Sequence, residues 1–297
     1  MAWETKGLLL PAPLQASWAA THAALPHVHA PYLYLSARDE DGRSHIGRIE
    51  LELTPNGPRP SGAAEHLLAP GPLGAFDDAG VTTSCLVDSG GRSFLYYTGW
   101  SLGASVPFYL FVGCAVADDG STFERLSPAP VFERNDVDPY LTASPWVLIE
   151  DGLWRAWYVS GLGWRRVNGQ PQHRYHIRYA ESADGVEWKR DGVVCVDFRD
   201  DDEYAFSRPC VVKDGDVYRM WFSARGASYR IGYAESSDGI TWERQDEEAG
   251  IESTGDWDAE MQAYPAVFDH GGRRYLLYNG NGYGRTGVGW AAAIASA

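Results

Sequence analysis

Short segments in which apolar and polar residues alternate recur along the chain. Residues 230–236, RIGYAES, place an apolar side chain at nearly every second position, as expected for a strand that buries one face. Residues 237–239, SDG, follow as a tight turn, because glycine permits positive φ and aspartate closes a side-chain turn. Residues 240–244, ITWER, resume a strand. The pattern therefore predicts a β-hairpin over residues 231–244.

The same hairpin is written more than once. IRYAESADGVEWKR at 177–190 and VGCAVADDGSTFER at 112–125 match IGYAESSDGITWER at 231–244. A second strand–turn–strand unit precedes each hairpin and recurs near the end of the chain, at 84–100, 145–163, 209–226 and 265–282. Together the two units give four antiparallel strands, the pattern of a propeller blade. The repeated tryptophan and Asp-Gly are interpreted as scaffold, because a catalytic site needs its groups only once.

The repeats predict an all-β fold, a five-bladed β-propeller that occupies residues 1–297 as one domain. A degenerate blade covers residues 29–68, three clear blades follow, and the last one after Ala263 lacks a strand. Residues 2–13 resemble the outer-strand phrase at 241–251, with Trp3 and Glu4 aligned to Trp242 and Glu243. We therefore expect the N-terminal strand to complete the last blade and close the ring. The remaining residues are assigned to loops, such as 164–174 and 197–204.

Composition narrows the function classes. The net charge of −15 argues against nucleic-acid and anionic membrane partners, which bind basic surfaces. Aromatic residues make up 13% of the chain, which suits half-buried strands and also sugar-stacking faces. The four cysteines lack metal-ligand spacing, and we identify no signal peptide or membrane span. The expectation is a cytoplasmic protein without metal or cofactor, acting on a small molecule or carbohydrate.

Residues just before each innermost strand are the candidates for chemistry, because propellers gather them around a central channel. Asp77 or Asp78 is predicted as base or nucleophile, and Glu260 or Glu203 as acid. The alternatives are loop capping for the aspartates and a solvated loop for Glu203. Candidate substrate contacts are His27, His29, Trp100, Ser144, Trp164, Arg208, Gln262, Tyr264, Asn281 and Arg285. Arg208 suits a substrate anion, or alternatively an ion pair with Glu203.

The blade phrase, the ring closure and the acidic strand starts resemble the five-bladed β-propeller glycosidases of the arabinanase, invertase and levansucrase type. FDDAGVTTSCLV at 76–87 and YNGNGYGRTGVG at 278–289 resemble most an uncharacterised branch labelled glycosyl hydrolase family protein. The resemblance implies a glycoside hydrolase that uses two carboxylates.

The sequence departs from that family at two strand starts. The family takes its acids from the first three blades, whereas this chain has His27 and His29 in the first and no glutamate in the third. The alternative is a non-hydrolytic propeller: a sugar-binding protein, a phosphorylase or transglycosylase, or a cyclase or lyase.

Overall fold

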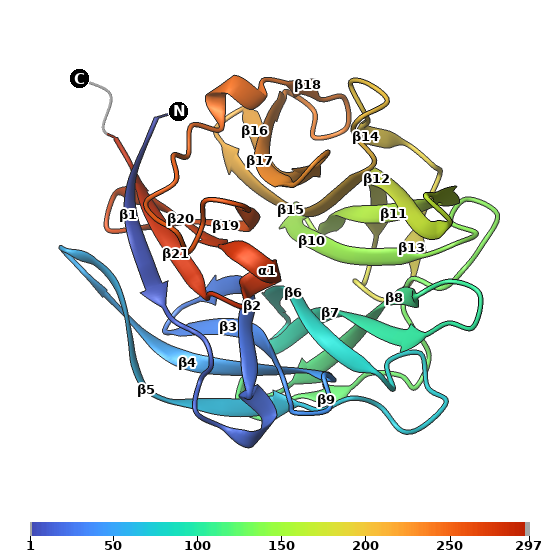
Figure 1. The fold of residues 1–297 in the computed structure, drawn as a ribbon, viewed down its shortest axis with the longest axis horizontal. Helices are drawn as coiled ribbons and strands as arrows, with labels where there is room; N and C mark the ends of the chain where they lie inside the picture. Colours follow the sequence, from blue (N-terminus) through green and yellow to red (C-terminus); the bar gives the residue numbers. More distant parts are fainter. Residues whose placement is uncertain (1, 295–297) are drawn as a thin grey trace.

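The computed structural model describes residues 2–294, and its strands are arranged in groups around a centre (Figure 1). Each group is antiparallel, and its strands follow one another from the innermost outward. In that order the groups are β2 (Thr21–His29), β3 (Tyr32–Arg38), β4 (Ser44–Thr54) and β5 (Gly57–Leu68); β6 (Gly80–Ser89), β7 (Arg92–Leu102), β8 (Phe108–Ala117) and β9 (Glu124–Arg125); β10 (Thr142–Glu150), β11 (Leu153–Val167) and β12 (Gln170–Ser182), with β13 (Trp188–Lys189) and β14 (Val194–Val196) both on β12; β15 (Ala205–Asp214), β16 (Val217–Arg225), β17 (Tyr229–Ser236) and β18 (Glu243–Arg244); and β19 (Ala263–His270), β20 (Arg273–Asn279), β21 (Val288–Ala293) and β1 (Trp3–Leu10).

Helical structure is confined to short turns between strands. These are η1 (Ser17–Ala19), η2 (Asp246–Glu248) and α1 (Asn281–Gly284), the last of which lies near the centre of Figure 1. Single parallel bridges, Ser44 to Gly80 and Tyr175 to Ala205, join neighbouring groups at their inner ends. Within residues 2–294 no helix has the length and apolar character needed to cross a membrane. The all-β prediction is confirmed.

The repeated phrase forms the hairpin turn predicted for it. The Asp238 carboxylate accepts hydrogen bonds from the backbone N–H groups of Ile240 and Thr241, at 2.7 Å each, and Asp184 does the same in its own copy. The carbonyl of Gly239 accepts from the indole of Trp242 and also from the indole of Trp157 in the preceding group. The phrase therefore shapes its own turn and fastens one group of strands to the next.

The N-terminal strand closes the structure as the sequence predicts. β1 pairs antiparallel with β21, with Trp3 opposite Ala293 and Leu10 opposite Val288. Trp3 is buried, and its ring meets Trp221 edge-on at 6.0 Å between centroids. This pairing leaves β1 as the outer strand of the last group, so the first and last strands of the chain belong to one sheet (Figure 1).

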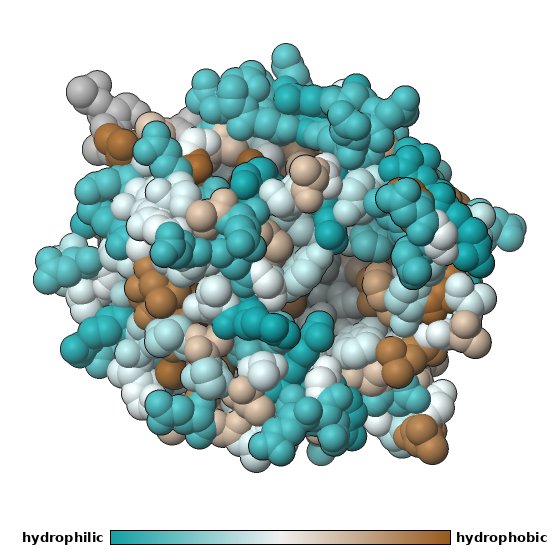
Figure 2. Space-filling model, viewed as in Figure 1, coloured by the Kyte–Doolittle hydropathy of each residue, from teal (hydrophilic) through white to brown (hydrophobic). Residues whose placement is uncertain are grey.

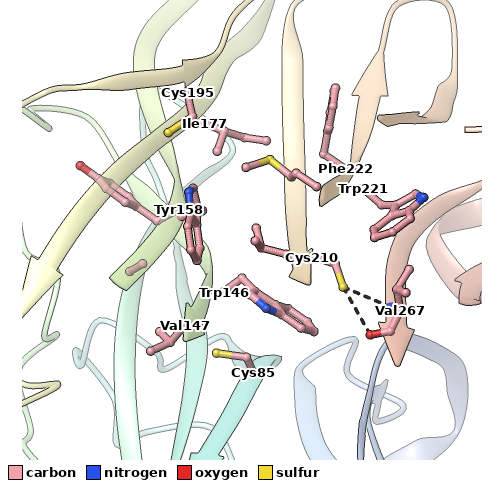
Figure 3. Packing of buried hydrophobic residues seen from close by; sticks show 14 of the residues in the cluster. Cys85, Trp146, Val147, Tyr158, Ile177, Cys195, Cys210, Trp221, Phe222 and Val267 are labelled. Atoms are coloured by element: carbon pink, nitrogen blue, oxygen red, sulfur yellow. Dashed lines mark hydrogen bonds between the residues drawn. The ribbon is translucent and has the colours of Figure 1, made fainter. Parts of the chain in front are cut away.

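The largest hydrophobic core runs between the groups and not within one of them. Trp146, Trp221 and Phe222 pack there with the buried free thiols Cys85, Cys195 and Cys210 (Figure 3). The Cys210 Sγ accepts a hydrogen bond from the backbone N–H of Val267 in the next group, at 3.1 Å. These thiols pack as small apolar side chains.

Two boundaries differ from the sequence prediction. The first group starts at Thr21, so β2 is its innermost strand, whereas the predicted blade begins at residue 29. The segment 164–174, predicted as a loop, continues the β11–β12 hairpin, with Trp164 paired to His173. The first difference matters most for the site. The innermost strand of the first group begins next to His22, and not at His27 or His29 as the sequence predicts.

Candidate functional site

A β-bulge interrupts every innermost strand at the centre of the molecule. The register shifts between Ala24 and His27, Thr83 and Cys85, Ala143 and Trp146, Ser207 and Cys210, and Ala263 and Ala266. In four strands a non-glycine residue with positive φ stands there directly before a proline: Leu25 (51°), Ser144 (44°), Arg208 (54°) and Tyr264 (58°). Bulges re-aim side chains, and positive φ at such residues is strained. The centre is therefore where the fold departs from regular strand geometry.

A cavity of about 430 Å³ lies among these bulges. Figure 2, which has the same view as Figure 1, shows a hollow near the centre of the molecule. Its aromatic lining residues are Trp100, Phe108, Tyr175, Tyr229, Tyr264 and Tyr283, and its hydroxyl-bearing ones are Ser36, Ser44, Thr82, Thr98, Ser144 and Ser207. The size and the mixture of aromatic faces with a few polar groups are typical of small-molecule sites.

The ionisable groups of this cavity are basic or neutral. Arg38 and Arg225 line it together with His22 and His173, and among the described residues no aspartate or glutamate does. Burial, and then the charges of Arg38 and Arg285, lower the pKa of His22 to about 4. Burial and the charge of Arg225 lower the pKa of His173 to about 4. Both histidines are therefore neutral at pH 7, and the two guanidinium groups carry the local charge.

Tyrosines surround Arg225. Its guanidinium carbon lies 5.4 Å, 5.1 Å and 5.6 Å from the ring centroids of Tyr204, Tyr229 and Tyr283. The hydroxyl groups of Tyr175 and Tyr229 hydrogen-bond at 2.8 Å, and burial raises the pKa of both. These phenols are therefore protonated and can donate or accept hydrogen bonds to a ligand.

The predicted acids lie elsewhere, and two of them, Asp77 and Glu203, belong to ion pairs that recur from group to group. The Asp77 carboxylate accepts from Arg125 Nε at 2.8 Å and from the Tyr97 hydroxyl at 3.2 Å. In the next group Asp138 accepts from Arg190 at 2.7 Å and from Tyr158 at 2.9 Å. In each case an acid ahead of the innermost strand binds the arginine that ends the repeated phrase. We call these contacts the blade pairs.

Glu203 belongs to the same set, and its carboxylate oxygens each accept from Arg244 at 2.8 Å. Thus the alternative of an Arg208 partner for Glu203 is wrong. Asp78 accepts from the backbone N–H of Gly74 at 2.9 Å, which is the loop-capping alternative. Glu260 is exposed on the surface. The expectation that Asp77, Asp78, Glu203 and Glu260 face one another at the channel is therefore corrected, because each has a different local environment and none lines the cavity.

Three of the predicted substrate contacts, Trp100, Ser144 and Tyr264, line the cavity. The Trp100 indole donates to the Ser44 hydroxyl at 2.7 Å, which fixes its ring at the wall. Trp164 stands behind the wall, with its ring 5.1 Å from Phe108 and 5.7 Å from His173. These aromatic positions are the part of the candidate site that the sequence located.

The other predicted contacts lie outside the cavity lining. Arg208 is 1% exposed and donates to the carbonyls of Thr83, Leu25 and Pro26, so it connects two innermost strands.

The two predicted histidines have partners within the protein. His27 is buried and accepts a hydrogen bond from the N–H of Leu86, and His29 pairs with Asp88 at 3.0 Å. In the last group Gln262 donates to Asp258, Asn281 caps the N–H groups of Glu260 and Met261, and Arg285 is exposed beside His22.

Sequence reasoning missed the basic lining residues, which are Arg38, Arg225, His22 and His173. Arg38 and Arg225 are the last residues of second strands, β3 and β16, and not the first residues of innermost ones. His173 lies on the extension of β12, in the segment predicted as a loop. The available signal was that none of these four residues occurs at the matching position of every repeat.

The arrangement of strand groups around a central cavity is similar to that of solved glycoside hydrolase structures. A solved structure described as a glycoside hydrolase matches with a TM-score of 0.72 and 18% identity, covering 99% of this chain and 93% of its own. The α-L-arabinofuranosidase from Lactobacillus brevis matches with a TM-score of 0.66 and 13% identity, covering 93% and 92%. At these identities the likeness concerns the fold.

Sequence similarity shows the family of this chain. The uncharacterized protein MT1551 of Mycobacterium tuberculosis (strain CDC 1551 / Oshkosh) is 43% identical over 297 residues, which cover 98% of this chain and 99% of that protein. The chain belongs to the same protein family as MT1551. No family model matches the sequence.

Proposed function

We propose that the protein is a glycoside-hydrolase-like enzyme that acts on a small sugar or glycoside in its central cavity. The observation that carries this proposal is the aromatic and hydroxyl lining of the cavity, at the point where the innermost strands meet. Aromatic faces pack against the apolar faces of sugar rings, while serine and threonine hydroxyls bond to sugar hydroxyls. Within the proposal, the strand groups are five blades and residues 1–297 are one domain.

A second candidate is a non-hydrolytic member of the same superfamily, such as a sugar-binding, phosphorylase or transglycosylase protein, or a cyclase or lyase. The observation that favours it is the lack of any aspartate or glutamate among the described cavity residues. Glycoside hydrolysis ordinarily uses two carboxylates across the scissile bond. The tyrosines and neutral histidines of the cavity supply hydrogen bonds and proton transfer, but not a carboxylate nucleophile.

Binding is tested with Trp100→Ala, since Trp100 is fixed against the cavity wall by Ser44. We expect sugars to quench tryptophan fluorescence of the wild-type protein, and the substitution to weaken binding by about tenfold, or ~1.4 kcal/mol. Trp18→Ala is the matched control, because Trp18 packs on His66 away from the lining residues. Equal sugar affinities in all three proteins would overturn the placement of the sugar.

Turnover separates the two candidates. Aryl glycosides and nucleotide sugars are incubated with the wild-type protein and with Asp77→Asn, Asp78→Asn and Glu260→Gln. Release of the aryl or nucleotide group together with the free sugar supports the hydrolase, whereas transfer of the sugar to phosphate or another sugar, or binding without release, supports the second candidate. Loss of turnover in one folded variant, with sugar binding retained, would return that carboxylate to a catalytic role.

A further inference from the structure

Two arginines of the central cavity have no partner for their charge. The guanidinium groups of Arg38 and Arg225 make no hydrogen bond or ion pair with another residue of 2–294. The Nε atom of Arg225 is buried without a partner. Arg38 lies over Trp100, at 5.8 Å from the ring centroid. Other arginines, such as Arg174, also have a buried Nε without a partner, so the distinguishing feature of Arg38 and Arg225 is that both line one cavity.

The arginines of the blade pairs have different surroundings. In the blade pairs, Arg125, Arg190 and Arg244 each contact a carboxylate within 2.8 Å. The net charge of −15 gives an excess of acids from which a partner for Arg38 and Arg225 would be readily available. An acidic protein that surrounds its cavity with positive charge and excludes its own carboxylates from it has a local field suited to a negative group.

Tyr264 and His173 line the same cavity as the two arginines. Arg225 and Arg38 both act on the Tyr264 hydroxyl, and each lowers the pKa that burial raises. The Nε2 atom of His173 is also buried without a hydrogen-bond partner. Arg38 and Arg225 thus line one cavity together with Tyr264, although they come from strands far apart in the sequence, β3 and β16.

We propose that the central cavity binds a sugar through an anionic substituent, a phosphate or a carboxylate, that Arg38 and Arg225 hold together. This inference rests on the proposed sugar-binding function and specifies its ligand class. A guanidinium group offers two parallel N–H donors to either anion. Trp100, which lies beside Arg38, then packs against the sugar ring, and the hydroxyl groups of Ser144 and Tyr229 contact its polar edge. The neutral histidines accept or donate hydrogen bonds without competing for the charge.

The test measures binding of glucose, glucose 6-phosphate, glucuronate and inorganic phosphate by isothermal titration calorimetry. We expect at least one of the charged sugars to bind about tenfold or more tightly than glucose, and the difference to shrink as salt is raised. Inorganic phosphate is expected to bind more weakly than the better charged sugar. Comparison of the phosphate and carboxylate arms identifies which anion the site prefers.

Arg225→Gln and Arg38→Gln are each expected to remove most of the advantage of the charged sugar while glucose binding changes little. Arg59→Gln is the matched control for loss of one positive charge, because Arg59 is exposed and paired with Glu52. Urea unfolding of each variant separates misfolding from loss of binding, and Arg225→Lys and Arg38→Lys keep the charge where the glutamine variant is unstable.

The outcomes distinguish this inference from the proposed function. Equal binding of glucose and both charged sugars, or charged-sugar binding that survives both substitutions, overturns the anion site and leaves the sugar site standing. Binding of inorganic phosphate, lost in Arg225→Gln, with no binding of any sugar, supports the anion site and overturns the sugar function. Absence of binding in every arm overturns both.

Discussion

Arginine has opposite surroundings in two regions of this protein. In the blade pairs Arg125, Arg190 and Arg244 each meet a carboxylate, and a tyrosine hydroxyl completes two of the three sites. In the central cavity Arg38 and Arg225 lie against aromatic rings, and no acid of residues 2–294 pairs with them. The first arrangement recurs with the repeat and stabilises each group of strands. The second places two arginines without an acid partner, among the described residues, in the lining of one cavity, which suits a negative group from outside the chain.

The largest effect is expected where a blade pair is most deeply buried. Asp138 is 0% exposed and accepts hydrogen bonds from Tyr158, Ser160, Arg178 and Arg190. Asp138→Ala leaves buried arginine charge without a partner and should lower the free energy of unfolding by about 3–5 kcal/mol in urea titrations. Asp136→Ala, at an exposed position two residues away, is the control. A loss of less than ~1 kcal/mol would contradict the structural role of the blade pairs.

A smaller loss is expected at the more accessible blade pair. Arg244→Gln removes the bidentate contact with Glu203 and a contact with Asp246. The free energy of unfolding should fall by about 1.5–3 kcal/mol, as for hydrogen bonds to charged groups. Sugar binding should stay at the wild-type level, because Arg244 does not line the cavity. Sugar affinity that fell in parallel with stability would show that the two regions are coupled.

Low pH should reduce the free energy of unfolding, because the two cavity histidines take up protons when the chain unfolds. The pKa values of His22 and His173 fall from 6.5 in the unfolded chain to about 4 in the folded one. The unfolded chain then binds more protons between these values, so this contribution to stability is complete above pH 6.5 and is lost as pH falls towards 4. Unfolding of the wild type, His22→Gln and His173→Gln at several pH values should show a shallower pH dependence in both variants. Parallel curves for all three proteins would contradict the lowered pKa values.

Substitution of a cavity arginine should cost little stability. Arg225→Gln removes a charge that has no ion-pair partner among the described residues, so the free energy of unfolding should be unchanged or rise by up to about 1 kcal/mol. Arg190→Gln, the same substitution in a blade pair, should lower it instead. Thermal unfolding of the two variants side by side gives the direct comparison, and equal losses would erase the distinction between the regions.

The smallest effect is expected at Glu260. Its side chain is exposed on the surface, and it lies outside both the blade pairs and the cavity lining. Glu260→Gln should change the free energy of unfolding by less than about 0.5 kcal/mol, as is usual for surface positions. Calorimetric binding of the best ligand should also be unchanged, and a tenfold loss of affinity would place Glu260 back in the site.

The scaffold can be predicted from the sequence because the same sequence pattern is repeated several times. The Asp-Gly turn, the alternating strands and the match between Trp3 and Trp242 predict local hydrogen bonds that the structure contains. The first group is harder to place because its strands lack the repeated phrase, so Tyr32–Arg38 reads as the innermost strand. That one-strand error displaces the expected lining from His22 to His27 and His29.

The candidate site is harder to predict because charged side chains near strand ends have two roles. Some hold the strand groups together in the blade pairs, and others line the cavity. The acids Asp77, Asp138 and Glu203 recur ahead of innermost strands, and their arginines recur at the end of the hairpin phrase. Applied consistently, the rule that repeated groups are scaffold would have assigned Asp77 and Glu203 to the blades. Arg38 and Arg225 could not be placed in this way, because their role depends on which strand ends meet in space.

The pairing of β1 with β21 has a consequence for how the chain is made. β1 leaves the ribosome before every other strand, and its partner β21 leaves after all of them. Until then β1 has no strand to pair with, and Trp3 cannot take its final position against Trp221. The strand groups between them can fold during synthesis, but the circle is completed only once β21 has emerged. Premature termination before residue 288 would thus leave an unpaired strand at each end, a species prone to exchange strands with its neighbours.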